Sequence, residues 1–356
     1  MRTAPRFAVK ELPAVLAQDL LAKTPKFIGD VVMGRRSATD ARGIIEYQLA
    51  RRKTLVNLEI TSRCNTSCKC CMRDPEILGF STNLTMSTED VERILDSYTP
   101  SEVQAVLLGG SESLLHPEFF PILEMVGQRF PLKQVDLYTN GIVLSREPET
   151  LARLADSGIG SVTFSVQGAR QETVSRLQPG VSMEGNLASA SYLHKNSDAS
   201  LWVNYVVQEA NVDEMLEFVD LIADSGFSGV SFIPYNAIDF ADGTYDYESE
   251  WQRMNLAERL QTARERATEH GLHMAHASDL CSCGLNMDII RTDGSVLLCP
   301  GPSSREFFIG NVFEEGIATV STRKKRRLKK VTRALQMGAV PPMCTACAIR
   351  RYHVLP

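Results

Sequence analysis

The chain has 356 residues, of which 44% are hydrophobic and 23% are charged, as is typical of a soluble globular protein. Its net charge of −5 disfavours nucleic acid as a partner, and its sequence has neither an apolar run approaching the roughly 20 residues of a membrane span nor the apolar core of a signal peptide. We therefore expect a cytoplasmic protein that does not contact a membrane.

The alternation of two sequence patterns predicts the fold. Residues 1–54 are polar with helical patterns, and we expect them to form a helical N-terminal extension. From residue 55 to about 245, helical patterns separate six apolar runs: TLVNLEI, VQAVLLGG, QVDLYTNG, SVTFSVQG, LWVNYVVQ and GVSFIPYN. Strands that alternate with helices form parallel sheets, and six units are too few for a complete eight-fold barrel. We predict an α/β fold, a partial (β/α)6 barrel resembling a TIM barrel, with its site at the carboxyl ends of the strands.

The rest of the chain is expected to contain two further parts. Residues 246–275 have the pattern of an amphipathic linking helix, and residues 276–356 that of a small α+β domain. Asp293-Gly294 between two apolar runs predicts a hairpin turn. Within the barrel, Ser87 is a predicted helix N-cap, and Gly158 stands where a helix is expected to end.

Four cysteines, Cys64, Cys68, Cys70 and Cys71, follow the first predicted strand. Without an export signal, thiols should remain reduced and free for metal. Cys64, Cys68 and Cys71 form C-x-x-x-C-x-x-C, and three thiolates in one loop can bind three corners of an iron–sulfur cube and leave the fourth iron open. Structural zinc or buried thiols are alternatives, but zinc normally needs a fourth ligand, and the nearest histidine, His116, belongs to another loop.

A second cysteine set lies in the C-terminal part of the chain. Cys281 and Cys299 flank the predicted hairpin, and Cys344 and Cys347 form C-T-A-C near the end of the sequence. Four thiolates can fully ligate one metal centre. Taken alone, this set fits a zinc ribbon about as well as an iron–sulfur cluster.

C-x-x-x-C-x-x-C after the first strand of an incomplete barrel resembles the radical S-adenosylmethionine (SAM) superfamily. In that family, the open iron of a [4Fe–4S] cluster binds the methionine part of SAM. One electron then splits SAM into methionine and a 5′-deoxyadenosyl radical, which takes a hydrogen atom from the substrate. The resemblance covers residues 55 to about 240 and implies a radical SAM oxidoreductase or epimerase. It also implies an external one-electron reductant of the flavodoxin or ferredoxin type.

The resemblance extends to residues that would hold SAM. GGSESLLHPEF resembles the family's Gly-Gly-Glu-Pro segment, with Gly110, Ser111, Glu112 and Ser113 in those four places. Glu112 keeps the carboxylate implied for the SAM ammonium group, whereas Ser111 and Ser113 depart from the family pattern.

Two later segments supply further SAM-binding candidates. FSVQG resembles the family's fourth-strand segment and implies that Ser165 and Arg176 hold the SAM carboxylate, with Gln167 where an acid is common. Asn140 in TNG is a candidate for the ribose. A turn-forming Asn-Gly pair is an equally good interpretation of Asn140.

The second cysteine set resembles the Twitch domain, a shortened SPASM domain with one auxiliary [4Fe–4S] cluster. The resemblance implies that Cys281, Cys299, Cys344 and Cys347 are its ligands, so the expected cofactors are two [4Fe–4S] clusters and SAM. Nine residues follow Cys347 and none is a cysteine, so we expect no second auxiliary cluster. Cys283 is either a small buried residue or a thiol that donates a hydrogen atom to a substrate radical.

Several functions remain open. A fully ligated cluster is suited to moving an electron, which favours oxidation or dehydrogenation of a small natural-product intermediate, such as an amino sugar, cyclitol or nucleoside. Epimerisation is expected if a thiol returns the hydrogen atom. Epimerisation or cross-linking of a ribosomal peptide is the alternative, and residues 1–54 show no leader-binding strands, so we favour a small-molecule substrate. A non-catalytic zinc-binding scaffold is the alternative from another class.

One further segment is strongly basic. Residues 321–330, STRKKRRLKK, contain seven Lys or Arg residues and no acid. This density suggests nucleic acid or another anionic partner. A solvated helix face is the favoured interpretation, because the remainder of the chain is acidic.

Overall fold

A computed structural model describes residues 53–71, 83–235, 246–275, 287–299, 307–336, 339 and 344. The described residues from Thr54 onward belong to one compact unit. The predicted N-terminal extension, residues 1–54, lies almost entirely outside the described residues, so its helical character stays a prediction.

The strands of this unit form one sheet with the order β10-β9-β8-β1-β2-β3-β4-β5-β6-β7. Neighbours from β1 to β6 are parallel, and each contains residues of one predicted apolar run, which confirms the predicted α/β class and partial barrel. These strands are β1 (Thr54–Leu58), β2 (Val103–Leu108), β3 (Val135–Thr139), β4 (Ser161–Ser165), β5 (Ser200–Val207) and β6 (Gly229–Pro234).

Four further strands extend the sheet on both sides. β7 (His273–Ala275) pairs with β6, and β8 (Met287–Ile290) pairs with β1, both in parallel. β9 (Ser295–Leu297) and β10 (Phe308–Asn311) continue it in antiparallel orientation. The turn between β8 and β9 contains Gly294 with φ +78°, so the predicted hairpin is confirmed. The described part of the C-terminal segment therefore continues the barrel sheet.

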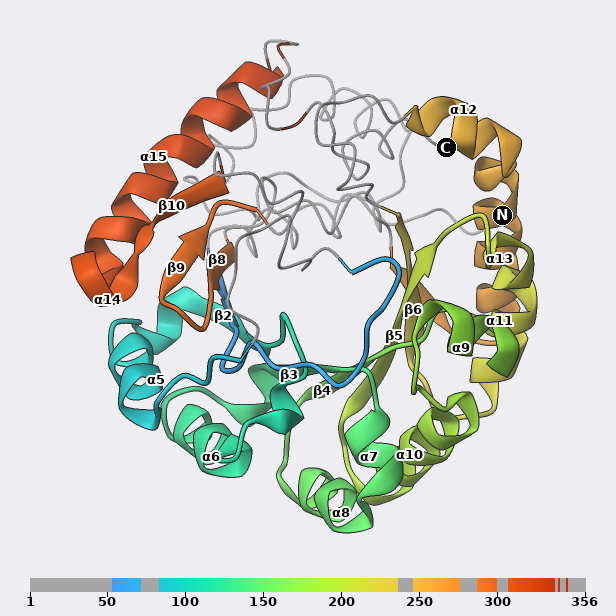
Figure 1. Ribbon diagram of the computed structural model, residues 1–356, viewed down its shortest axis with the longest axis horizontal. Helices are drawn as coiled ribbons and strands as arrows, with labels where there is room; N and C mark the ends of the chain where they lie inside the picture. Colours follow the sequence, from blue (N-terminus) through green and yellow to red (C-terminus); the bar gives the residue numbers. More distant parts are fainter. Residues whose placement is uncertain are drawn as a thin grey trace, which may run out of the picture. The chain divides into compact units, whose positions relative to one another are not determined.

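The helices cover the outer side of the sheet, where α5, α6, α8, α10, α13 and α15 stand at the periphery (Figure 1). None of the helices in the described part of the chain is long and apolar enough to cross a membrane. The helices are α5 (Thr88–Leu95), α6 (Phe119–Arg129), α7 (Ile142–Arg146), α8 (Pro148–Asp156), α9 (Gln171–Leu177), α10 (Met183–Asn196), α11 (Met215–Ala223), α12 (Tyr247–Arg253), α13 (Leu256–Glu269), α14 (Val312–Glu315) and α15 (Ile317–Gln336), with short 3-10 helices η2 (Pro100–Glu102), η3 (Ser113–Leu115), η4 (Leu132–Gln134) and η5 (Val212–Glu214).

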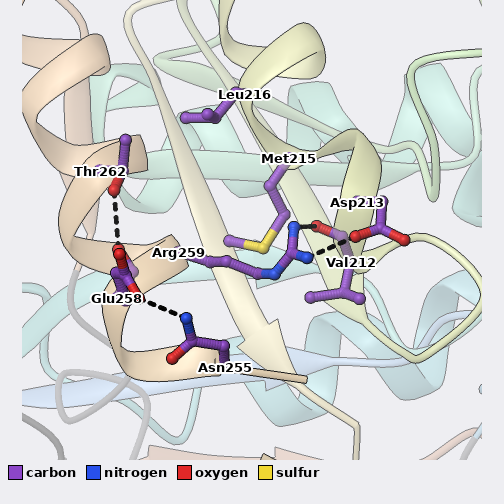
Figure 2. A pocket seen from close by; sticks show the side chains of 8 residues that line it. All are labelled: Val212, Asp213, Met215, Leu216, Asn255, Glu258, Arg259 and Thr262. Carbon is purple, nitrogen blue, oxygen red and sulfur yellow. Dashed lines mark hydrogen bonds and ion pairs between the residues drawn. The ribbon is translucent and has the colours of Figure 1, made fainter. Parts of the chain in front are cut away.

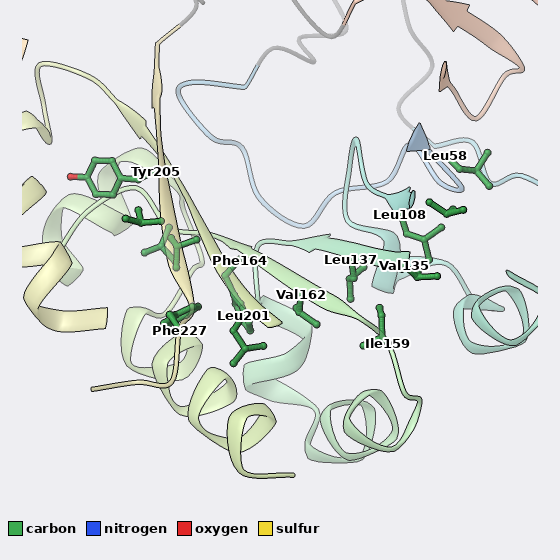
Figure 3. Packing of buried hydrophobic residues seen from close by; sticks show 14 of the residues in the cluster. Leu58, Leu108, Val135, Leu137, Ile159, Val162, Phe164, Leu201, Tyr205 and Phe227 are labelled. Atoms are coloured by element: carbon green, nitrogen blue, oxygen red, sulfur yellow. The ribbon is translucent and has the colours of Figure 1, made fainter. Parts of the chain in front are cut away.

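Alternate strand residues separate the two faces of the sheet. Leu58, Val162, Phe164 and Tyr205 are fully buried against the helices, and Figure 3 shows this packing. Burying one such side chain stabilises the fold by roughly 1.5–3 kcal/mol, so this alternation fixes which face turns outward. The intervening residues, such as Thr163, therefore face the inside of the partial barrel.

Local signals set the helix boundaries. The hydroxyl of Ser87 accepts a hydrogen bond of 3.1 Å from the backbone N–H of Asp90, as the N-cap prediction required, and Gly158 beyond α8 has φ +76°. The predicted linking helix of residues 246–275 is instead two helices followed by β7. The helices separate at Asn255, whose φ of +48° lies in the left-handed region that asparagine tolerates better than most residues.

Candidate functional site

The loop after β1 carries the first cysteine set at the carboxyl end of the parallel strands. Cys64 and Cys71 are exposed, whereas Cys68 and Cys70 are partly buried. The backbone N–H of Cys71 donates to the carbonyl of Cys68 at 3.1 Å, so the last two cysteines of the motif stand on one turn. The thiols therefore project from a rim loop, which leaves room for a bound group.

The loop after β2 is tied to the beginning of this cysteine loop. The Ser111 hydroxyl donates to the carbonyl of Thr61, and the backbone N–H of Glu112 donates to the carbonyl of Arg63 at 3.2 Å. Serine at position 111, where the sequence departs from the family pattern, thus makes a contact that anchors the loop.

Gly110 lets the loop after β2 approach the end of β1. Its φ is +108°, and a Cβ at this position would stand 3.3 Å from Cβ of Glu59. Glu59 is buried and forms an ion pair of 3.5 Å with buried Arg291, which follows β8. The predicted SAM-binding glycine therefore packs beside a pair that joins β1 to the C-terminal hairpin.

Glu112 is buried and connects the loop after β2 to the end of β3. Its two carboxylate oxygens accept from the hydroxyl of Thr139 at 2.9 Å and from the backbone N–H of Asn140 at 2.8 Å. Burial raises the pKa of Glu112 to about 7, although these hydrogen bonds favour the ionised form. The structure thus gives Glu112 a bracing role, and its contact with the SAM ammonium group stays a prediction.

Asn140 joins the loop after β3 to the cysteine loop. Its side-chain N–H donates to the Asn65 side chain at 2.8 Å, and the same nitrogen lies 3.9 Å from Sγ of Cys64. Its side-chain oxygen accepts from the backbone N–H of Ile142 at 2.9 Å, as in an Asx turn. Asn140 therefore forms the turn and also contacts the cysteine loop, while its contact with the ribose stays a prediction.

The far end of the cysteine loop rests on the end of α9. The backbone N–H of Lys69 donates to the carbonyl of Leu177 at 2.9 Å, and the Thr66 hydroxyl donates to the carbonyl of Pro179 at 2.8 Å. The Thr66 hydroxyl oxygen also lies 3.8 Å from Sγ of Cys68. The loops after β2 and β3 and the segment at the end of α9 therefore hold the cysteine loop.

Gln178 is a site residue that the sequence motifs missed. It is 1% exposed, its amide N–H donates to the carbonyl of Ser165 at 3.1 Å, and its amide oxygen accepts from the backbone N–H of Gln167 at 2.8 Å. Its side chain also hydrogen-bonds the thiol of Cys68. A glutamine before Pro-Gly carries no sequence signal for such a role, because the role depends on the packing of α9 against β4.

The two residues predicted to hold the SAM carboxylate are placed differently. Ser165 is the partly buried last residue of β4, beside Gln178. Arg176 is exposed on α9, and its guanidinium donates to the carbonyl of Ala210 beyond β5 at 3.0 Å. Within the described part of the chain, no hydrogen bond joins Ser165 to Arg176, so their joint role stays a prediction.

Burial raises the pKa of two thiols in the cysteine loop, those of the motif residue Cys68 and of its neighbour Cys70. Burial raises the pKa of Cys68 to about 11; the Thr66 hydroxyl opposes this shift, and nearby Cys71 and Cys64 add to it. Burial raises the pKa of Cys70 to about 12. Three mutually repelling thiolates need a cationic centre between them, which is what iron–sulfur clusters supply.

The spacing of the described side chains also bears on the kind of metal. Among the described residues, no group of three or more His, Cys, Asp or Glu side chains is gathered closely enough to hold a single metal ion. The ligands of an iron–sulfur cube bind different irons and therefore stand farther apart than the ligands of one ion. The donor set of Cys64, Cys68 and Cys71, and their position on the rim loop, thus fit the expected cluster.

The second cysteine set is described only in part. Cys299 is partly buried just beyond β9, and Cys344 is 8% exposed in the hydrophobic core. Cys281, Cys283 and Cys347 lie outside the described residues. Their predicted roles as cluster ligands, and that of Cys283 as a hydrogen donor, are therefore not tested by the structure.

A buried polar group lies close to Cys299. The ammonium of Lys324 on α15 pairs with Asp288 of β8 at 2.8 Å, and the Tyr98 hydroxyl donates to the other Asp288 oxygen at 2.8 Å. Burial lowers the pKa of Lys324, whereas Asp288 and then Cys299 oppose this shift. Lys324 therefore lies within electrostatic reach of a predicted cluster ligand.

Two cavities lie near β5 and the helices that follow it. One of about 370 Å³ lies at the carboxyl ends of β5 and β6 and is lined in part by Gln208, Tyr235 and Trp251. Another of about 230 Å³ lies between α11 and α13, where Arg259 reaches across to Asp213 at 2.5 Å (Figure 2). The first cavity lies at the same end of the parallel strands as the cysteine loop. The second is crossed by the ion pair between Arg259 and Asp213.

Comparison with known families identifies the barrel. Residues 58–232 match the family model described as Radical SAM superfamily. The chain therefore carries a radical SAM domain. This family uses a [4Fe–4S] cluster and SAM, which confirms the cofactors expected for the barrel. The match ends at residue 232, so the C-terminal Twitch domain stays a prediction.

Named relatives match over about half of the chain. The GTP 3',8-cyclase of Synechococcus sp. (strain CC9902) is 30% identical over 206 residues, 53% of this chain and 57% of that protein. Molybdenum cofactor biosynthesis protein 1 of Dictyostelium discoideum is 24% identical over 205 residues, 57% of this chain and 32% of that protein. The chain thus spans only 32% to 57% of the length of these curated relatives.

A solved structure shares the fold over a longer stretch. Streptococcus suis SuiB bound to precursor peptide SuiA has a TM-score of 0.59 and 16% identity, covering 90% of this chain and 80% of that chain. This likeness supports the partial-barrel fold. At this identity it says nothing of substrate.

Proposed function

We propose that the chain is a radical SAM enzyme that cleaves SAM reductively and takes a hydrogen atom from a substrate. When bound, the [4Fe–4S] cluster supplies the electron that splits SAM into methionine and a 5′-deoxyadenosyl radical. The observation that carries this proposal is the hydrogen-bonded junction around the cysteine loop, in which Glu112 and Asn140 connect it to β2 and β3.

In this proposal, Cys64, Cys68 and Cys71 hold the cluster, and their neighbours stabilise the thiolates. Thr66 and Gln178 both reach the sulfur of Cys68. Hydrogen bonds to a charged sulfur favour the thiolate over the thiol, which offsets part of the cost of burial. The neighbouring Cys70 has no such role in the proposal and keeps its proton.

The residues proposed to bind SAM lie on the rim around this loop. Gly110 gives the loop after β2 its close approach to β1, and ionised Glu112 would attract the SAM ammonium group. Ser165 at the end of β4 is proposed to donate its hydroxyl to the carboxylate, with Arg176 as a second donor.

The inner face of the barrel supports a polar substrate. Ser165, Asn204 and Ser231 stand in register on β4, β5 and β6. Their strand neighbours Phe164, Val203 and Phe232 are buried on the opposite face. The side-chain amide of Asn204 makes no hydrogen bond within the described part of the chain, so it is available to a ligand.

Within the small-molecule class, we favour a nucleoside or nucleotide. The Synechococcus relative is named for an activity on GTP, and a nucleoside offers the hydroxyl groups that the polar inner face would hydrogen-bond. The relatives give no comparable support to an amino sugar or cyclitol, or to oxidation over epimerisation. Peptide modification remains the alternative outcome of the substrate test below.

We also propose that Cys281, Cys299, Cys344 and Cys347 bind an auxiliary [4Fe–4S] cluster in a Twitch domain. Cys299 packs against the hydrophobic cluster that contains Cys344, although 45 positions separate them in sequence. Iron analysis after anaerobic reconstitution tests this. Serine at the three barrel cysteines should remove about half of the iron, because the second cluster would remain.

The central test is anaerobic incubation with SAM and dithionite. The wild type should produce 5′-deoxyadenosine, Cys68→Ser should produce none, and Cys70→Ser should retain production, because Cys68 is one of the three proposed cluster ligands and Cys70 is not. Electron paramagnetic resonance (EPR) should show the reduced cluster signal change on SAM addition. A colourless, zinc-containing protein that leaves SAM intact would instead support the scaffold.

The substrate is tested with deuterium. GTP and other nucleotides, nucleosides, amino sugars and candidate peptides are each supplied in deuterated form, and transfer of deuterium into 5′-deoxyadenosine identifies the substrate. Transfer from an amino sugar or a peptide, with none from any nucleoside, would overturn the nucleoside proposal. Solvent deuterium in the product would indicate epimerisation.

A further inference from the structure

The outward face of α15 carries a stripe of cations, defined here as Lys325, Arg326, Lys329, Lys330 and Arg333. All five are exposed and recur at the spacing of one helix face. α15 contains eight Lys or Arg residues and no acid, whereas the whole chain has a net charge of −5, so the remainder carries −13. The charge of the molecule is therefore strongly polarised toward this helix.

The stripe is also unneutralised. None of its five side chains forms an ion pair in the described part of the chain. Exposed arginines on or beside other helices do pair: Arg253 of α12 with Glu209, Arg266 of α13 with Asp220, and Arg170, the N-cap of α9, with Glu217. Five adjacent unpaired cations repel one another, and an anionic surface would relieve that repulsion.

The opposite face of α15 is fixed to the sheet. Val320 is fully buried, Lys324 pairs with Asp288 of β8, and the Arg323 guanidinium donates to the carbonyl of Ile309 in β10 at 2.7 Å. The stripe is therefore presented on a firmly attached helix at the outside of β9 and β10 (Figure 1). On the inner side of that helix, Lys324 lies within electrostatic reach of Cys299.

We propose that the α15 stripe is the docking surface for an acidic one-electron donor protein of the flavodoxin or ferredoxin class. This inference rests on the proposed function, which needs an external reductant. Attraction between opposite charges accelerates the encounter and orients the donor. In this proposal, one electron would leave the reduced flavin or iron–sulfur centre of the donor and would reduce a [4Fe–4S] cluster held by the cysteines of the chain.

The test compares charge reversals of equal size at two places. Lys329→Glu/Lys330→Glu alters the stripe, whereas Lys195→Glu/Arg264→Glu alters two cations of α10 and α13 for which no ion pair is seen in the described residues. Each reconstituted full-length protein is mixed anaerobically with reduced flavodoxin, and cluster reduction is followed by stopped-flow absorbance at low and high salt. Binding of oxidised flavodoxin is measured in parallel.

At low salt, the stripe variant should lose about tenfold or more in reduction rate and in flavodoxin binding, because reversed charges repel the donor. High salt should slow the wild type toward the rate of the variant, since ionic screening acts over about 10 Å at 0.1 M. The α10/α13 variant should behave as the wild type. Equal losses in both variants, or no loss in either, would overturn the proposal.

Two controls separate this inference from the proposed function. Dithionite is small and needs no docking, so both variants should make 5′-deoxyadenosine with dithionite at the wild-type rate. Failure of all proteins with dithionite would refute the enzyme while flavodoxin binding still reports on the surface. Binding of a mixed-sequence RNA that the stripe variant abolishes, with unchanged reduction by flavodoxin, would overturn the donor assignment.

Discussion

The side chain of Asn140 donates a 2.8 Å hydrogen bond to the side chain of Asn65, one residue after the first cysteine of the barrel motif. The two residues come from the loops after β3 and β1, and the same amide nitrogen lies 3.9 Å from Sγ of Cys64. The Asn140 side chain thus joins two rim loops directly beside one predicted cluster ligand.

Asn140→Asp is expected to weaken cluster retention more than it weakens the fold. Aspartate keeps the oxygen that accepts from Ile142, but it loses the donor to Asn65 and places a negative charge beside Cys64. Chelator-dependent loss of iron should therefore be faster than in the wild type. Asn140→Ala also loses the turn and should lower unfolding free energy by about 1 kcal/mol. Wild-type iron retention in Asn140→Asp would contradict this role.

Gln178→Ala should destabilise the protein by about 1–3 kcal/mol, because it leaves the carbonyl of Ser165 and the backbone N–H of Gln167 buried without partners. It should also speed iron loss, since the contact with Cys68 disappears. Urea unfolding and iron release are the measurements. The matched control is Gln128→Ala, an exposed glutamine on α6 for whose side chain no hydrogen bond is seen in the described residues. Similar effects in the two variants would count against a special position for Gln178.

Glu112→Gln should flatten the pH dependence of SAM binding. The pKa of Glu112 is raised to about 7 by burial, so the carboxyl is mostly neutral at pH 6 and mostly ionised at pH 8. If it receives the SAM ammonium group, affinity should rise across this range in the wild type. SAM titrations followed by EPR at both pH values measure it. A wild-type affinity that is independent of pH would restrict Glu112 to its bracing role.

Asp136→Asn should remove a pH-dependent loss of stability. Asp136 faces the inner side of the barrel and accepts from Ser161 and Thr163, and burial raises its pKa from 3.8 to about 7. Below pH 3.8, the carboxyl is protonated in both the folded and the unfolded state and does not affect the free energy of unfolding. As the pH rises toward 7, the unfolded state ionises while the folded state stays protonated, so the folded state is increasingly destabilised. Between pH 5 and pH 8, the free energy of unfolding of the wild type should fall by about 2–3 kcal/mol, and that of the variant should not show this fall. Urea unfolding of both proteins at pH 5 and pH 8 measures this difference. An equal fall in the free energy of unfolding in the two proteins would contradict the prediction.

The regular part of the fold was predictable because its signals are local. Each of the six apolar runs contains one strand of the sheet, and Ser87 caps its helix as expected, since both depend on residues adjacent in sequence. β7 was missed, because three residues of His273–Ala275 are too few to show a period. The predicted linking helix is interrupted at Asn255, whose backbone is left-handed. The spacing of apolar residues does not predict such an interruption.

The site was predictable in part for the same reason. The spacing of Cys64, Cys68 and Cys71 predicts them as cluster ligands, and that role stays a prediction. Strand order correctly placed their loop beside those of Gly110 and Asn140. Gln178 escaped notice because its partners on β4 are brought near only by packing of α9. The contacts of Arg176 could not be predicted either, because the direction of its side chain on α9 is not encoded in a local motif. In the structure, its guanidinium donates to the carbonyl of Ala210 in the loop after β5.

The parallel pairing of β1 with β8 has a consequence for how the chain is made. Thr292 donates to the carbonyl of Glu59 across 233 residues of sequence, so during synthesis β1 waits for most of the chain to emerge before its second neighbour exists. Until then its backbone is an open edge that can pair with other chains. A truncation before residue 287 would make that exposure permanent and should produce an aggregating protein, even though every residue of the barrel cysteine motif is retained.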